Sequence, residues 1–309
     1  MTLVQLEYIV AVDEYRHFAS AAEACFVTQP TLSMQIHKLE DQLGVIIFDR
    51  SKQPVVPTKI GQEIISQARI VLSEAAKIKE LIEEEKGKIS GALRIGVIPT
   101  ISPYLIPLFI KNFSDQYPEV TMTIEEHITD DILKGLLENK LDLGILATPS
   151  GVDSLTEQVI YNEEFVAYLG KDHPLMKVNS IDPFLLDTDD VWVLDEGHCF
   201  REQVLNICQN PGVDSPVKFK SGSLEALKRI VDKQGGMTLL PELATYNLSP
   251  EDKKQLKWFK EPKPVREVSL VTHRSFLKKR LTEALYKAIK ESLPMELQDE
   301  KVVQRINWY

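Results

Sequence analysis

Residues 21–50 read AAEACFVTQPTLSMQIHKLEDQLGVIIFDR, and this stretch decides the fold of the N-terminal part of the chain. After the turn VTQPT, apolar residues spaced four, three and four apart predict one buried stripe on a helix that ends at Gly44. The stripe consists of Leu32, Ile36, Leu39 and Leu43. A short alanine-rich helix precedes the turn, and Pro30 suits the first turn of the helix that follows. This is the spacing of a helix-turn-helix, whose second helix can enter a DNA major groove.

The polar side of that helix is the predicted DNA-contacting surface, together with a short β-wing, IIFDRSKQPVVPT, that follows it. An ordinary three-helix bundle has the same apolar spacing, so the pattern alone leaves DNA binding and plain packing both open. Cys25 in the preceding helix is expected to pack in the core. The candidate DNA contacts are Gln29, Pro30, Thr31, Ser33, Met34, His37, Lys38, Arg50 and Lys52.

Composition limits the classes of protein to consider. The 309 residues carry 36 Lys and Arg against 46 Asp and Glu, a net charge of −10, so charge alone favours neither nucleic acid nor an anionic membrane as a partner. No apolar run approaches the roughly 18 residues that a membrane helix needs, and the N-terminus lacks the basic lead-in of a secretory signal. Three cysteines indicate a reducing compartment. We therefore expect a cytoplasmic protein without membrane contact.

A long helix is predicted from about residue 59, with apolar residues spaced four, three, four, three and four apart. This average period of about 3.5 is typical of a coiled-coil seam. We favour a dimerising seam, because DNA-binding domains of this type use two-fold symmetry to bind paired half-sites. The alternative is a long helix that lies on its own domain. The seam residues are Ile64, Ala68, Val71, Ala75, Ile78 and Ile82.

From Gly91 onward, short apolar runs alternate with amphipathic segments, which predicts an α/β domain with mostly parallel strands. The expected strands are ALRIGVI, VTMTIEEH, LDLGILA, FVAYLG, VWVLD, MTLLP and EVSLVTH. The expected helices cover residues 101–117, 130–139, 200–210, 223–234 and 276–293. The final segment, residues 294–309, is expected to be a surface extension.

The segment VLDEGHCFREQVLNIC, residues 193–208, carries the most distinctive chemistry. Cys199 stands at the expected start of a helix, where free N–H groups stabilise a thiolate. Nine residues of helix separate it from Cys208 by about 13.5 Å, whereas a disulfide needs Cα atoms within roughly 7 Å. A bond between them would therefore require the helix to unwind. Two buried, inert cysteines remain an alternative, and a zinc site with His198 fits no usual spacing.

Residues 21–50 resemble the winged helix-turn-helix of LysR-type transcriptional regulators. Residues 90–309 resemble the two-subdomain, Rossmann-like, periplasmic-binding-protein-type effector domain of the same family, with chain crossings near 162–165 and 264–268. The resemblance implies a nucleoid-associated regulator, not an enzyme, that binds double-stranded promoter DNA, contacts RNA polymerase and forms dimers and homotetramers. The implied organisation is a reader at 1–58, a dimerisation helix at 59–89 and a regulatory domain at 90–309, with subdomain I at about 90–162 and 268–309 and subdomain II at about 163–267.

Within that family, GHCFREQVLNIC resembles the redox switch of peroxide-sensing members. The stretch VIPTISPYLIP at 97–107 and the region around Arg266 also resemble these members. The resemblance implies that Cys199 is the thiol oxidised by hydrogen peroxide and that Cys208 then forms a disulfide with it. It also implies that Thr100, Thr129 and His198 orient the peroxide and that Arg266 favours the thiolate. No cofactor or metal is expected, and the output would be activation of oxidative-stress genes. Two alternatives stay open: a regulator sensing a small anionic metabolite with inert cysteines, and a thiol peroxidase.

Overall fold

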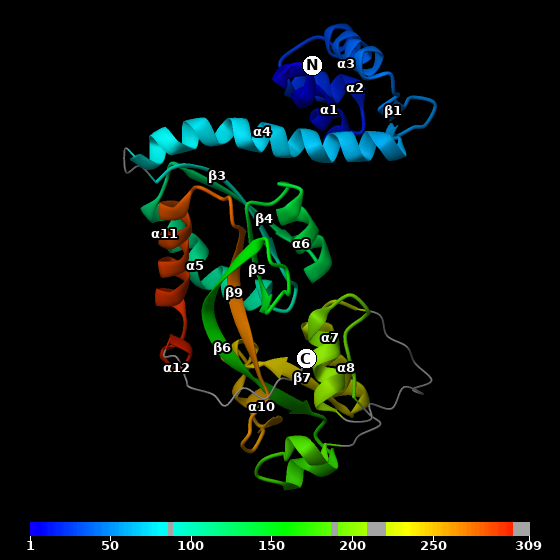
Figure 1. Ribbon diagram of the computed structural model, residues 1–309. Coiled ribbons are helices and arrows are strands. Elements are labelled where there is room, and N and C mark those ends of the chain that lie inside the picture. Colours follow the sequence, from blue (N-terminus) through cyan, green and yellow to red (C-terminus); the bar gives the residue numbers. More distant parts are fainter. Residues whose placement is uncertain (86–88, 187–190, 209–220, 299–309) are drawn as a thin grey trace. The chain divides into compact units, whose positions relative to one another are not determined.

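The computed structural model describes residues 1–85, 89–186, 191–208 and 221–298, and it shows a mixed α/β protein (Figure 1). The chain forms two compact units: the first holds the residues up to the end of α4 and the segment Leu137–Lys140, and the second begins at Ile89. Residues 86–88 of the predicted linker and residues 299–309 of the predicted extension lie outside the described residues. In the described part of the chain, no helix is both long and apolar enough to cross a membrane.

The N-terminal unit is a helical bundle with a two-stranded wing. Its elements are α1 (Leu3–Tyr15), α2 (Phe18–Ala24), α3 (Gln29–Leu43), β1 (Phe48–Asp49), β2 (Val56–Pro57) and α4 (Lys59–Glu85). The side chain of Thr28 accepts a hydrogen bond from the Thr31 N–H and so caps α3, and Gly44 ends the helix with a φ of 68°. The predicted stripe is buried except for its last member, Leu43, which is 41% exposed because it lies in the final turn. Cys25 packs against the core of this unit, which confirms its predicted role.

The first half of α4 packs on α1 of its own unit. Ala68 is 2% exposed, and the buried Arg69 guanidinium donates to the carboxylates of Asp13 at 3.1 Å and Glu14 at 2.8 Å. The second half differs, since Ile78 is 67% and Ile82 is 52% exposed. The predicted seam is therefore divided. Ala68 serves the unit's own core, Ile64 and Val71 pack against that core, and exposed apolar residues are concentrated toward the C-terminal end.

The second unit contains a seven-stranded sheet with the order β4-β3-β5-β9-β6-β7, and β8 pairs with β6. Its strands are β3 (Gly91–Val97), β4 (Val120–Glu126), β5 (Leu143–Thr148), β6 (Leu155–Leu169), β7 (Met237–Pro241), β8 (Leu256–Trp258) and β9 (Val265–His273). Only the pairs β3–β4 and β3–β5 are parallel, so the prediction of mostly parallel strands is wrong. The cause is the 15-residue strand β6, which pairs antiparallel to β9 along the predicted chain crossings.

All five predicted helices of this unit are present, and short ones join them. The helices are α5 (Ser102–Gln116), α6 (Thr129–Leu137), α7 (Cys199–Ile207), α8 (Leu224–Gln234), α9 (Glu242–Thr245), α10 (Pro250–Lys253), α11 (Lys279–Ser292) and α12 (Met295–Gln298). The predicted strand VWVLD is wrong, because Val191 makes only an isolated bridge to Met237. The segment after Leu293 is not simply a surface extension, since Leu297 on α12 is 2% exposed and lies in the core.

Candidate functional site

The two cysteines of the predicted switch stand at opposite ends of α7. Cys199 is the first residue of the helix and is partly exposed, whereas Cys208 follows its last residue and is fully buried. Both are free thiols. Burial raises the pKa of Cys208 to about 12, so its thiol stays protonated near neutral pH. The helix keeps the two sulfur atoms apart, and of the two only Cys199 is partly exposed.

Cys199 borders a small hollow that, as it stands, is too narrow to admit a water molecule. Its walls come from the loop after β3, the start of α6 and the start of α7, and they consist of Ile98, Thr100, Ile128, Thr129, His198, Cys199 and Phe200. The structure therefore brings together the sulfur and three of the four predicted peroxide-binding side chains. The Oγ1 atom of Thr129 is buried and, among the described residues, has no hydrogen-bond partner. An unpartnered buried hydroxyl is rare, so it marks this hollow as a place where a polar partner is missing.

Arg266, the fourth predicted residue, is 1% exposed and borders the hollow through Thr100. Its Nη1 donates to Thr100 Oγ1 at 2.9 Å and its Nη2 to the Thr100 carbonyl at 3.2 Å. Arginine offers only donors, so the Thr100 hydroxyl accepts and keeps its own proton to donate elsewhere. The guanidinium also lies 5.0 Å from the centre of the Phe200 ring. It is held by Glu163, whose Oε1 accepts from Nε at 2.9 Å.

The protonation states follow from these surroundings. Burial by itself lowers the pKa of Arg266, but electrostatic interactions with Glu163 first, and then with Tyr161 and Cys199, raise that pKa above its ordinary value. Burial lowers the pKa of His198, and Asp195 opposes this only in part. At neutral pH the site therefore holds a permanent cation and a neutral imidazole that can donate or accept a hydrogen bond.

Two glycines shape the position of His198. Gly197 has a φ of +89°, a left-handed conformation that side chains rarely adopt, and it turns the chain into α7. A Cβ atom at Gly222 would lie 2.7 Å from His198 Nε2. The imidazole thus rests against the bare backbone of Gly222, which sequence reasoning did not single out.

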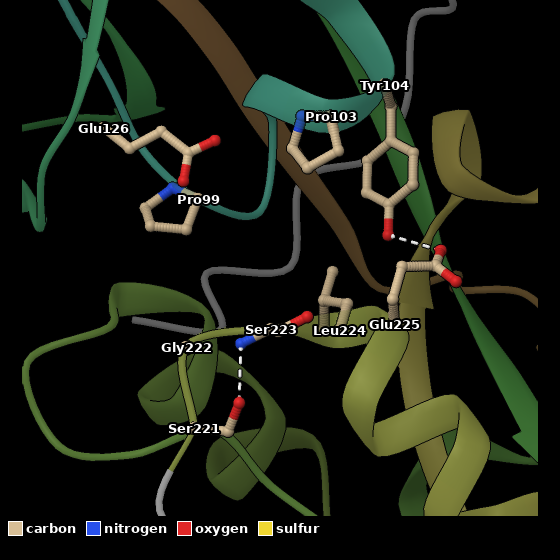
Figure 2. A pocket seen from close by; sticks show the side chains of 9 residues that line it. All are labelled: Pro99, Pro103, Tyr104, Glu126, Ser221, Gly222, Ser223, Leu224 and Glu225. Atoms are coloured by element: carbon tan, nitrogen blue, oxygen red, sulfur yellow. Dashed lines mark hydrogen bonds between the residues drawn. The ribbon is translucent and has the colours of Figure 1, made fainter.

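Gly222 also lines a second and larger pocket of about 630 Å³ empty volume (Figure 2). Figure 2 shows Tyr104 on α5 facing Glu225 on α8, and the Tyr104 hydroxyl donates to the Glu225 carboxylate at 3.2 Å. A second carboxylate, Glu126, stands on the other side, beside Pro99. Lys228 lies 4.0 Å from Glu225 and offsets part of that charge. Two carboxylates in one pocket disfavour an anionic ligand there.

The predicted DNA contacts occupy one region of the N-terminal unit. Ser33 is partly buried, and the exposed ones are Gln29, Pro30, Thr31, Met34, His37, Lys38, Arg50 and Lys52. The Arg50 guanidinium is already engaged, because it donates to Glu40 at 3.0 Å and to Ser33 at 3.3 Å and lies over the Phe18 ring. Arg50 would have to exchange a partner to reach a phosphate, whereas Lys38 on α3 is exposed.

Sequence reasoning missed Glu163, although its position carried a signal. A carboxylate inside a strand whose neighbours are buried is rare unless a cation pairs with it. Within the described residues there is also no group of three or more His, Cys, Asp or Glu side chains that could hold a metal ion.

Residues 3–62 match the bacterial regulatory helix-turn-helix protein model of the lysR family, and residues 86–294 match the LysR substrate binding domain model. The DNA-binding transcriptional dual regulator OxyR of Escherichia coli is 38% identical over 275 residues, 88% of this chain and 89% of that protein. A hydrogen peroxide-inducible genes activator of Haemophilus influenzae is 36% identical over 273 residues, 88% of this chain and 90% of that protein.

Solved structures give the same result. A full-length OxyR variant from Pseudomonas aeruginosa has a TM-score of 0.80 at 35% identity and covers 98% of this chain and 100% of its own. A peroxide-bound OxyR mutant from Corynebacterium glutamicum has a TM-score of 0.60 at 27% identity, covering 94% and 92%. The resemblance found in the sequence and the α/β fold that it implied are confirmed.

Proposed function

Because the chain belongs to the LysR family of bacterial transcriptional regulators, we propose that it is a DNA-binding regulator switched by hydrogen peroxide. The observation that carries this proposal is the unpartnered Thr129 hydroxyl in the hollow beside Cys199. Hydrogen peroxide is small and uncharged, and each of its oxygens both donates and accepts hydrogen bonds. Once the side chains around the hollow move apart to admit it, peroxide can satisfy Thr129 while it presents an O–O bond to the sulfur.

In the first step, the Cys199 thiolate attacks one peroxide oxygen and forms an S–O bond as the O–O bond breaks. The leaving hydroxide takes up a proton and departs as water, so the sulfur is oxidised by two electrons to a sulfenic acid and the peroxide is reduced. Thr100, Thr129 and His198 donate hydrogen bonds to the peroxide oxygens as negative charge develops on the leaving one. Arg266 stabilises the thiolate before the attack, because it is a cation held close to the sulfur.

In the second step, Cys208 condenses with the sulfenic acid to form a disulfide and releases one water molecule. Burial fixes the order of these steps, since Cys208 cannot meet peroxide while it is covered and protonated. The helix holds the Cα atoms of Cys199 and Cys208 about 13.5 Å apart, whereas a disulfide needs them within roughly 7 Å. The helix must therefore unwind before the bond can form. Oxidation is therefore coupled to the unwinding of α7.

The DNA side of the proposal uses residues 1–58 as the reader, with α3 in the major groove, and residues 59–89 as the dimerising linker. Residues 90–309 act as the regulatory domain. Disulfide formation changes how regulatory domains pack in a dimer or tetramer, and this alters DNA contacts and the recruitment of RNA polymerase at promoters of defence genes.

The proposal is tested by DNA footprints of the reduced and peroxide-treated protein, run beside the Cys199→Ser variant. The parent should change its footprint after brief treatment with low peroxide, and the variant should not. A Cys199→Ser protein that still changes its footprint would overturn the mechanism.

Two further measurements distinguish the proposed function from two other functions. A sensor of a small anionic metabolite would change its footprint with that ligand and ignore its thiols, and the carboxylates of the larger pocket speak against it. A thiol peroxidase would consume peroxide catalytically with excess thiol reductant, whereas a regulator reacts about once per reductive cycle.

A further inference from the structure

The cation of the site is one half of a cross-strand pair. β6 and β9 run antiparallel, and their register sets Glu163 directly opposite Arg266. Opposite charges at such positions attract, and here both side chains are removed from water, with exposures of 0% and 1%. Glu163 Oε1 accepts from Nε at 2.9 Å and lies 2.8 Å from Nη2, so the carboxylate binds one edge of the guanidinium.

Glu163 is itself fixed at its other oxygen. Oε2 accepts from the backbone N–H of Leu243, in the first turn of α9, at 2.9 Å. With one edge of Arg266 held by Glu163, its Nη1 and Nη2 also donate to Thr100, which lines the hollow. The orientation of Arg266 therefore depends on Glu163 of β6, which is itself held by the Leu243 N–H of α9.

The charges of this cluster have a further consequence. The groups that act on the pair are Tyr161 on β6, Tyr104 on α5, Tyr246 directly after α9, and the Cys199 sulfur on α7, and Glu242 on α9 lies nearby, where it accepts from the Glu164 N–H. The tyrosines are neutral near pH 7 because burial raises their pKa values. With Cys199 as a thiol, the carboxylate of Glu163 alone already balances the charge of Arg266, and Glu242 adds a further carboxylate nearby. When Cys199 ionises, two anions share the one cation.

We propose that Glu163 is the positioning residue that orients Arg266 and limits how strongly this cation favours the Cys199 thiolate, so that it sets the pH above which Cys199 becomes reactive. This inference rests on the peroxide function proposed above, but it concerns the sulfur itself. It can therefore be tested with a reagent other than peroxide.

The experiment measures how fast Cys199 reacts across pH in the full chain, with iodoacetamide and in parallel with hydrogen peroxide plus dimedone, and assigns the product to Cys199 by mass spectrometry. Glu163→Gln removes the competing anion, so the midpoint of the pH–rate profile should move about one pH unit toward acid. Well below both midpoints, the variant should then react roughly tenfold faster than the parent. An unchanged midpoint, or a shift toward alkaline pH, would overturn the inference.

A second variant keeps the charge and disturbs the geometry. Glu163→Asp should leave the midpoint near that of the parent but lower the peroxide rate on the high-pH plateau several-fold, because a shorter side chain cannot hold Arg266 in place. If Glu163→Gln does not fold, this variant decides alone, and a plateau rate equal to that of the parent refutes the positioning role.

The matched control is Glu164→Gln, which removes a carboxylate one residue further along β6. Glu164 is 7% exposed and pairs with Lys263 at 2.9 Å, whereas the register places Glu163, not Glu164, opposite Arg266. Its midpoint and plateau should equal those of the parent, and a shift as large as that of Glu163→Gln would remove the specific role of Glu163. If Cys199 of the parent reacts with iodoacetamide but not with peroxide, the proposed function fails, and the iodoacetamide profiles still decide on Glu163.

Discussion

The stability of α7 should control the disulfide step and leave the first oxidation unaffected. Glu202 allows a clean test, because it lies in the first turn of α7 with its side chain 70% exposed, 4.0 Å from Arg201. Glu202→Ala and Glu202→Gly remove the same carboxylate and the same contact. They differ in helix propensity by about 1 kcal/mol, with glycine the weaker helix former. Since 1.4 kcal/mol is a factor of ten, this difference corresponds to about a fivefold change in rate.

We expect the Glu202→Gly protein to form the Cys199–Cys208 disulfide about five times faster than the Glu202→Ala protein. The assay mixes each protein with peroxide, blocks free thiols at timed points and quantifies the disulfide-linked peptides by mass spectrometry. A parallel series carries Cys208→Ser, so that only the sulfenic acid forms, and dimedone measures its rate. In that series the two variants should agree within a factor of two.

Equal disulfide rates for the two variants would show that α7 does not open before the bond forms. A fivefold difference that appeared already in the sulfenic acid step would also refute the reasoning, because the substitution would then act on the reactivity of Cys199. Circular dichroism of the reduced proteins checks that both variants keep the parent fold.

Three further predictions concern other parts of the chain. Replacing both Ile78 and Ile82 with Asp should dissociate the proposed dimer, because these exposed apolar residues of α4 would be buried in its seam and the substitution puts charges there. Sedimentation showing an intact dimer would contradict this. Gly222→Ala should slow the sulfenic acid step at Cys199 by about tenfold, since a Cβ atom there displaces His198; an unchanged dimedone rate would rule out its role. Lys38→Ala should lower the log–log salt slope of operator binding by about 1, measured by titration at several salt concentrations; an unchanged slope would exclude a phosphate contact.

Local sequence signals were sufficient to predict the helices of the N-terminal unit. The N-cap Thr28, the early Pro30 and the terminal Gly44 act within a few residues of the helix that they delimit, so α3 could be predicted with its boundaries. Leu43 was assigned to the buried stripe because its spacing fits. Burial in a last turn, however, depends on whether another element covers it, and that information is not local.

The sheet and the site depend on contacts between distant residues. The strand prediction found only FVAYLG of β6, because the residues before it, among them Glu163, are polar and interrupt the apolar run. Glu163 lies within a buried strand only because Arg266, about a hundred residues later, is brought opposite by the register. The Cys199 segment was identified from its resemblance, but its connection to the cation through Thr100 required the fold.

The anchoring of α4 has a mechanical consequence. Ala68 and Arg69 fix one half of this helix in the core of the reader, so the reader follows any tilt of the helix as one rigid piece. The 27 residues of α4 extend roughly 40 Å. Pivoting such a rod by about 5° displaces its end by roughly 3.5 Å, close to the rise of one base pair, about 3.4 Å. In the proposed dimer, a change of a few degrees between the two copies of α4 would thus be enough to shift one DNA-binding unit relative to the other by one base pair.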